Sequence, residues 1–157
     1  MTDRPTGQAV YLETNFFIKA VEGIPEVAGP PKKLIEVLRT KRGLGITSEI
    51  TFAETLAPPR RSDSLPLHIK RRAYLDLLLW SGFITLIPVT RDVLIETADL
   101  RMVARMKLPD AIHLVSAIRS KCRYLVSSDS DFDRLPDGMT QVIPDAEGIG
   151  NLLKVLA

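Results

Sequence analysis

The sequence predicts an α/β fold in which helices flank both sides of a mostly parallel central sheet, an α/β/α sandwich. Short apolar runs of strand length alternate along the chain with longer segments whose apolar residues recur at helical spacing, which is typical of such sheets. The length of 157 residues is that of one ordinary domain, and the sequence contains no repeat or linker. We therefore expect residues 1–157 to form a single domain.

The composition excludes several classes of protein. Lys and Arg number 21 and Asp and Glu 19, so the net charge of +2 is unlike that of a highly charged disordered chain. The single cysteine, Cys122, excludes an intrachain disulfide and a multi-cysteine zinc site. The first residues lack the pattern of a signal peptide, and no apolar stretch approaches the roughly 20 residues that a membrane helix needs. We expect a soluble, cytoplasmic protein without a membrane partner.

The first third of the chain contains two short apolar runs, each followed by a capped helical segment. Thr14 or Asn15 is expected to cap the first helix, and Ser48 can cap the third, because their side chains accept hydrogen bonds from free backbone N–H groups. Pro30 and Pro31 are expected to open the second helix, where a missing N–H costs nothing. The pattern thus predicts strands at 9–12 and 44–47 and helices at 16–21, 30–42 and 48–56.

The rest of the chain continues the alternation after a polar loop at 60–66. Leu75, Leu78 and Leu79 are expected to face the core from one helix, and Thr90 and Pro109 to mark the starts of two others. The pattern predicts helices at 67–80, from Thr90 to 106, at 111–121 and at 147–155, and strands at 83–89, 124–127 and 141–143.

Carboxylates lie where such a sheet binds its ligands, just beyond the carboxyl ends of the strands. Glu13 follows the first strand, Asp129 and Asp131 follow the strand at 124–127, and Asp110 begins the helix before that strand. Taken singly, each also has an ordinary explanation as a turn, helix-start or surface residue. Together they predict one acidic site at the edge of the sheet.

Glu54 is a further candidate, on the helix that follows the second strand. Its neighbours Phe52, Ala53 and Leu56 are apolar, and a carboxylate beside an apolar stripe is costly unless a cation or donor meets it. Glu49 is a weaker candidate because it falls in the first helical turn, where the helix dipole alone explains a carboxylate.

Converging carboxylates repel one another, which raises their pKa values, and a divalent cation relieves that repulsion. Oxygen ligands suit Mg²⁺ or Mn²⁺, and a metal held in this way can activate water for in-line attack on phosphorus. The residues by themselves therefore favour metal-dependent hydrolysis of a phosphodiester.

Four segments resemble the sequence blocks of PIN domains, in the order in which that family has them. The family's blocks are a strand ending in Asp-Thr-Asn, a helix ending in Glu, the pattern Asp-Ala-x-His-Leu, and a strand followed by Thr/Ser-x-Asp and Asp-Phe. The matching segments are YLETNFFI (11–18), SEITFAE (48–54), LPDAIHL (108–114) and YLVSSDSDF (124–132). In length and compactness the chain most resembles the VapC-type toxins of toxin–antitoxin pairs.

The resemblance implies a Mg²⁺- or Mn²⁺-dependent endoribonuclease, a hydrolase that cleaves single-stranded or looped RNA. It also implies a homodimer and a small antitoxin protein whose tail blocks the cleft. The family's catalytic and metal-binding carboxylates correspond to Glu13, Glu54, Asp110 and Asp129. The polar positions that support the site correspond to Asn15, Ser127 and Asp131.

One position departs from the family pattern, because Glu13 stands where the family has Asp. A misplacement of about 1 Å at a catalytic group can cost on the order of 100-fold in rate. One alternative is therefore a catalytically impaired RNA- or protein-binding module with the same fold. An aspartyl-phosphate phosphatase is disfavoured because it needs an Asp nucleophile at this position, and a structure-specific DNA nuclease because the chain is too short for its extra helices.

Two further features have an ordinary explanation as well as a functional one. His113 lies three residues after Asp110, and packing or a supporting hydrogen bond is favoured over a role as ligand or base. Arg101, Arg105 and Lys107 recur at helical spacing ahead of Asp110, which fits a solvated helix face and is also compatible with RNA binding.

Overall fold

The structure, a computed structural model, describes residues 8–58 and 65–157 and confirms the α/β expectation. The strands are β1 (Val10–Leu12), β2 (Gly45–Ser48), β3 (Ile84–Ile87), β4 (Tyr124–Val126) and β5 (Thr140–Val142). They form one sheet in the order β3-β2-β1-β4-β5, in which every neighbouring pair is parallel. The polar loop predicted at 60–66 lies mostly outside the described residues.

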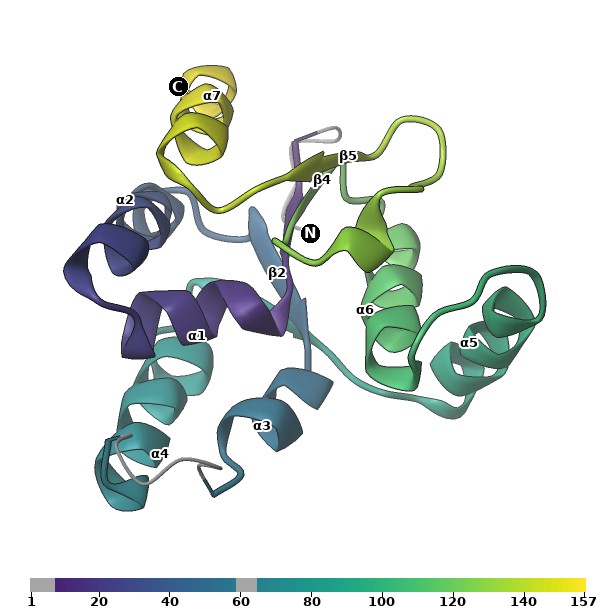
Figure 1. The fold of residues 1–157 in the computed structure, drawn as a ribbon, viewed down its shortest axis with the longest axis horizontal. Coiled ribbons are helices and arrows are strands. Elements are labelled where there is room, and N and C mark those ends of the chain that lie inside the picture. Colours follow the sequence, from purple (N-terminus) through teal and green to yellow (C-terminus); the bar gives the residue numbers. More distant parts are fainter. Residues whose placement is uncertain (1–7, 59–64) are drawn as a thin grey trace.

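Helices cover both faces of the sheet. They are α1 (Thr14–Glu22), α2 (Pro25–Thr40), α3 (Ile50–Thr55), α4 (Leu67–Leu75), α5 (Arg91–Val103), α6 (Leu108–Arg119) and α7 (Ala146–Leu156). In Figure 1, α1, α2, α4 and α7 lie on one side of the sheet and α5 and α6 on the other. A π-helical turn, Asp76–Trp80, continues α4, and a 3-10 turn, Ser130–Phe132, follows β4. No helix within 8–58 or 65–157 is long and apolar enough to cross a membrane.

The buried residues of β1 divide between two cores because successive side chains of a strand point to opposite faces. Val10 and Leu12 join the core under α1, α2 and α7. Tyr11 joins the core on the α6 side of the sheet, where Leu114 and Leu125 also lie. The fully buried strands explain why the sequence shows continuous apolar runs rather than alternation.

The register of the central strands brings their carboxyl ends together. Leu12 of β1 lies opposite Val126 of β4, and the backbone N–H of Glu13 donates to the Val126 carbonyl at 3.1 Å. The residues that follow, Glu13 and Ser127, therefore lie side by side at one edge of the sheet. The acidic candidates were predicted at this edge.

The N-terminal cap of α1 and the first residue of α2 differ from the prediction. Helix α1 begins at Thr14, and its cap is Glu13, whose carboxylate accepts from the Asn15 N–H, rather than Thr14 or Asn15. Helix α2 begins at Pro25, so Pro30 and Pro31 lie inside it and do not open it. Pro25 already occupies the favourable first position of that helix.

The buried face of α4 also differs from the prediction in one residue. Leu78 is buried as expected, but Leu79 is 49% exposed, and Tyr74 and Leu77 complete the buried face. The backbone widens here, because the Ser81 N–H donates to the Asp76 carbonyl five residues back. The remaining elements were predicted to within about three residues of their ends, as expected for frayed termini.

Candidate functional site

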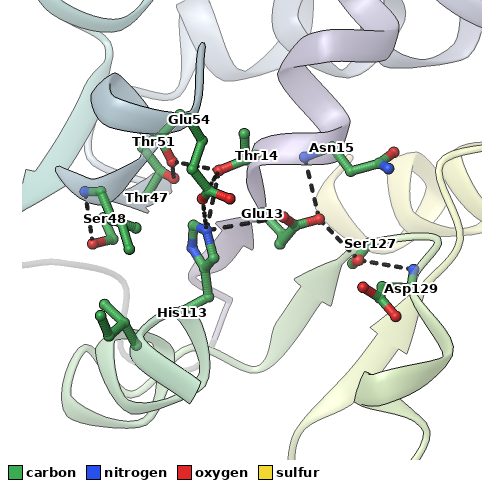
Figure 2. A network of polar contacts seen from close by, with 12 residues as sticks. Glu13, Thr14, Asn15, Thr47, Ser48, Thr51, Glu54, His113, Ser127 and Asp129 are labelled. Atoms are coloured by element: carbon green, nitrogen blue, oxygen red, sulfur yellow. Dashed lines mark hydrogen bonds and ion pairs between the residues drawn. The ribbon is translucent and has the colours of Figure 1, made fainter. Parts of the chain in front are cut away.

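The structure brings all of the predicted carboxylates to one end of the sheet but divides them into two groups. Glu13, Glu54 and His113 form one group, the glutamate–histidine cluster. Asp110, Asp129 and Asp131 form the other, the aspartate cluster. Within each cluster the potential ligand atoms lie within 4.8 Å of one another. Glu13 lies between His113 and Ser127, and Asp129 lies beyond Ser127 (Figure 2).

Hydrogen bonds hold the side chain of Glu54 in the glutamate–histidine cluster. Thr14 Oγ1 donates to Glu54 Oε1 at 2.8 Å, and His113 Nε2 lies at 2.8 Å from the same oxygen. On the other side of the ring, His113 Nδ1 lies 2.7 Å from the Tyr11 hydroxyl. His113 and Tyr11 are both fully buried. Each ring nitrogen of His113 thus has a polar partner.

The protonation of this cluster follows from its contacts. Burial alone would raise the pKa of Glu54, but the hydrogen bond and charge of His113 and the Thr14 hydroxyl lower it below its ordinary value. An ionised carboxylate can only accept, so the proton in the contact between Glu54 and His113 lies on Nε2 of the ring. Burial raises the pKa of Tyr11 well above its ordinary value, so its hydroxyl stays protonated beside His113 Nδ1.

Glu13 links the two clusters. Its Oε2 accepts from the Asn15 N–H at 3.2 Å and from Ser127 Oγ at 3.1 Å. Its Oε1 lies 3.9 Å from His113 Nε2. Burial raises the pKa of Glu13 above its ordinary value, although the charge of His113 opposes this. The longer side chain is therefore accommodated with partners on both sides.

Asp110 is the least satisfied carboxylate of the described residues. Its side chain comes from the first turn of α6, and the residue is 8% exposed. Burial, a hydrogen bond with Asp131 and the nearby charges of Asp129 and Glu13 raise the pKa of Asp110 to about 7. Its Oδ2 is buried and has no hydrogen-bond partner among the described residues. Within the same residues, no lysine or arginine forms an ion pair with the aspartate cluster.

The loop after β4 places Asp129 and Asp131. The Asp129 N–H donates to Ser127 Oγ at 3.0 Å, and the Asp131 N–H donates to Asp129 Oδ1 at 2.9 Å. Gln141 of β5 donates to the carbonyls of Ser127 and Asp129, both at 2.9 Å. Ser127 thus supports both Glu13 and Asp129.

Part of this arrangement was missed by the sequence analysis. Tyr11 and Thr51 belong to the network through His113 and Thr14, and neither had been singled out. Asn15 does lie at the site, where its Oδ1 accepts from Ser128 Oγ at 3.1 Å. The one available signal was the alternation of β1, which places Tyr11 on the face of the sheet that α6 covers.

The arrangement suits a divalent cation. Oxygen-only ligands favour Mg²⁺ or Mn²⁺, and the aspartate cluster offers three carboxylates that repel one another. The buried Asp110 Oδ2 is the kind of unsatisfied polar atom for which an ion accounts. The residues present therefore fit a metal.

Comparison with known proteins gives a family and a fold. Residues 10–138 match the family model of the PIN domain. No curated protein matches the chain.

Solved structures resemble it over most of its length. A toxin–antitoxin complex from Klebsiella pneumoniae is 23% identical, with a TM-score of 0.62 over 87% of this chain and 98% of that one. VapBC2 from Rickettsia felis, bound to a DNA fragment from its promoter, is 17% identical, with a TM-score of 0.62 over 85% of this chain and 96% of that one. VapC20 from Mycobacterium tuberculosis, a sarcin–ricin loop cleaving toxin, is 16% identical, with a TM-score of 0.63 over 80% and 93%.

Proposed function

This chain belongs to the PIN domain family, and from that premise we propose that it is a metal-dependent endoribonuclease, the toxin of a toxin–antitoxin pair. The family match covers most of the chain, and the fold is shared with a toxin that cleaves the sarcin–ricin loop. The site offers the oxygen ligands that metal-dependent phosphodiester hydrolysis requires.

The observation that carries the proposal is the state of Asp110. A buried carboxylate oxygen without a partner, beside two further aspartates, is destabilising unless a cation meets it. A purely structural cluster would be expected to satisfy this oxygen with a protein donor. The position of Asp110 thus favours a metal site over a structural role.

The proposed ligands are Asp110 and Asp129 with Glu13 and Glu54, which would hold one or two Mg²⁺ or Mn²⁺ ions. A bound ion would supply Lewis-acid chemistry, by activating a water for in-line attack and stabilising the leaving oxygen of the RNA phosphate. Ser127 and the Asn15 N–H orient Glu13, and the Tyr11–His113 pair and Thr14 orient Glu54. Asp110 would release its proton when the cation binds.

Cleavage of a labelled single-stranded RNA by the purified protein tests the proposal. We expect cutting with Mg²⁺ or Mn²⁺, none with EDTA, and loss of cutting in Asp110→Asn. Asp137→Asn is the matched control, because it removes an exposed carboxylate outside both clusters.

The same assay separates the catalytically impaired alternative. Cutting that occurs only in Glu13→Asp would mean that the site is built but mispositioned, and that the chain is an RNA- or protein-binding module. The two hydrogen bonds that Glu13 Oε2 accepts, from Ser127 Oγ and the Asn15 N–H, favour the active enzyme.

An antitoxin and a second copy of the chain are the proposed protein partners. One of the similar structures, from Klebsiella pneumoniae, is a toxin–antitoxin complex, which supports the antitoxin. Exposed apolar side chains, Ile24 and Trp80 among them, offer surface for such contacts. Light scattering of the purified chain would test the homodimer, and co-purification with the product of an adjacent reading frame would test the antitoxin.

A further inference from the structure

The connection between α5 and α6 forms a groove beside the aspartate cluster. A hollow of about 740 Å³ is lined by Arg101, Arg105, Lys107 and Asp131. A neighbouring hollow of about 870 Å³ is lined by Arg105, Arg134 and Asp131. We call the two hollows together the α5–α6 groove. Asp131 lines both hollows and belongs to the aspartate cluster, so the groove adjoins the candidate metal site.

Two of the cationic side chains that line this groove have no anionic partner in the described residues. Arg105 and Lys107 are exposed, and neither side chain has an ion pair or a hydrogen bond within the described parts of the chain. By contrast, the exposed Arg119, on α6, pairs with Glu96 of α5. Two neighbouring cations that the protein leaves unpaired favour an anionic ligand.

Arg101 differs from Arg105 and Lys107 because its side chain forms a hydrogen bond within the protein. Its Nε donates to the Met106 carbonyl at 3.1 Å and so closes the turn after α5. This bond fixes the backbone on either side of Arg105 and beside Lys107. The two unpaired cations are therefore presented from an anchored connection.

The groove also exposes apolar surface. Met102 and Val103 are 83% and 85% exposed, more than any other large apolar side chain of the described residues. Each lines one of the two hollows. Proteins that bind single-stranded nucleic acid combine cations, which contact the phosphates, with apolar surface, which contacts the bases.

We propose that the α5–α6 groove binds the backbone of single-stranded RNA next to the cleaved bond, with Arg105 and Lys107 on its phosphates. This inference rests on the proposed function, because the cleaved phosphate must lie at the aspartate cluster and the adjoining strand then enters the groove. An acidic protein segment is the other possible ligand. RNA is favoured because the groove shares Asp131 with the aspartate cluster, where the cleaved phosphate would lie.

Binding in the absence of cleavage tests the groove. The probe is a fluorescent oligouridine about 12 nucleotides long, followed by anisotropy in EDTA, where metal-dependent cutting stops. We compare wild type with Arg105→Ala/Lys107→Ala over a range of salt concentrations. The control is Lys32→Ala/Lys33→Ala, which removes the same charge from exposed positions of α2, across the sheet (Figure 1).

We expect the groove variant to bind about 10-fold more weakly at physiological salt. The slope of log affinity against log salt should fall by about 1.4, since each phosphate contact contributes about 0.7 for single strands. The control should change affinity less than about 2-fold and leave the slope unaltered. In Mg²⁺, the groove variant should raise KM for RNA and leave kcat nearly unchanged.

Three results would overturn the inference, and each differs from a failure of the proposed function. Equal losses in the groove variant and the control would mean that only general charge matters. Unaltered binding in the groove variant would place RNA elsewhere. Tight binding of polyglutamate through Arg105 and Lys107, without binding of RNA, would assign the groove to an acidic protein segment. If wild type binds RNA through the groove but never cuts it, the proposed activity fails and the groove stands.

Discussion

The two clusters lie side by side at the same end of the sheet, yet they handle their negative charge in opposite ways. In the glutamate–histidine cluster, Glu54 has hydrogen-bond donors from Thr14 and His113, and its pKa is lowered. In the aspartate cluster, the partners of Asp110 are other carboxylates, and its pKa is raised to about 7.

The difference separates two tasks that an acidic site must perform. Donors around a carboxylate fix its orientation and keep it ionised without an ion. Carboxylates facing one another keep affinity for a cation, because only a cation or a proton relieves their repulsion. We infer that the glutamate–histidine cluster aligns the site and that the aspartate cluster provides most of the attraction for the metal.

Loss of Asp110 should have the largest effect on activity. Asp110→Asn keeps the shape of the side chain but removes a proposed ligand, so we expect RNA cleavage to fall by at least about 100-fold. Metal binding measured by calorimetry should weaken in parallel. Full activity in Asp110→Asn would show that the aspartate cluster is structural. Asp137→Asn is the control variant for both RNA cleavage and metal binding.

The stability of the metal-free protein should depend on the charge of Asp110. Because its pKa is raised in the folded state, the folded form is favoured when Asp110 is protonated, and stability is lost as pH rises from about 4 to about 7. After a discount for solvent screening, we expect Asp110→Asn to be more stable than wild type by about 2 kcal/mol at pH 7.5. Urea unfolding in EDTA measures this.

The difference between Asp110→Asn and wild type should shrink as pH falls towards 4, and Mg²⁺ should abolish it by stabilising wild type alone. A difference that does not vary with pH would mean that Asp110 is already neutralised by another group.

Shortening Glu13 should have an intermediate effect. Glu13→Asp restores the usual residue of the family, but its carboxylate no longer reaches both Ser127 and the Asn15 N–H while facing His113. We expect cleavage to fall by about 10-fold, since small misplacements at a catalytic group are costly. The matched control is Glu147→Asp, an exposed glutamate in the first turn of α7. An increase in activity would instead support the impaired-enzyme alternative.

The smallest effect on cleavage is expected at Tyr11, which contacts Glu54 only through His113. Tyr11→Phe leaves His113 Nδ1 buried without its hydrogen-bond partner, so stability should fall by about 1–2 kcal/mol. Cleavage should fall only about 3-fold, because Glu54 keeps its bond from Thr14. Tyr124→Phe is the control, since the Tyr124 hydroxyl has no hydrogen bond within the described chain.

Asp110→Asn and Tyr11→Phe should therefore change the stability of the metal-free protein in opposite directions. Two changes of the same sign would remove the distinction between the clusters.

Much of the fold and the position of the site could be predicted from the sequence alone. Apolar runs and helical spacing are local properties, so they located the strands, the helices and the edge at which Glu13 and Asp129 lie. The cap of α1, the start of α2 and the orientation of Leu79 were wrong because each depends on neighbouring backbone contacts that the sequence pattern does not contain.

The division of the carboxylates into two clusters was decided only by the tertiary structure. His113 is 102 residues from Tyr11 and 59 from Glu54, and no spacing within the sequence links these partners. The sequence shows that a carboxylate lies near the end of a strand. Which hydrogen-bond donors or charges surround that carboxylate depends on how the folded chain packs. Donors surround Glu54, whereas carboxylates surround Asp110, and this long-range packing sets the opposite directions of their pKa values.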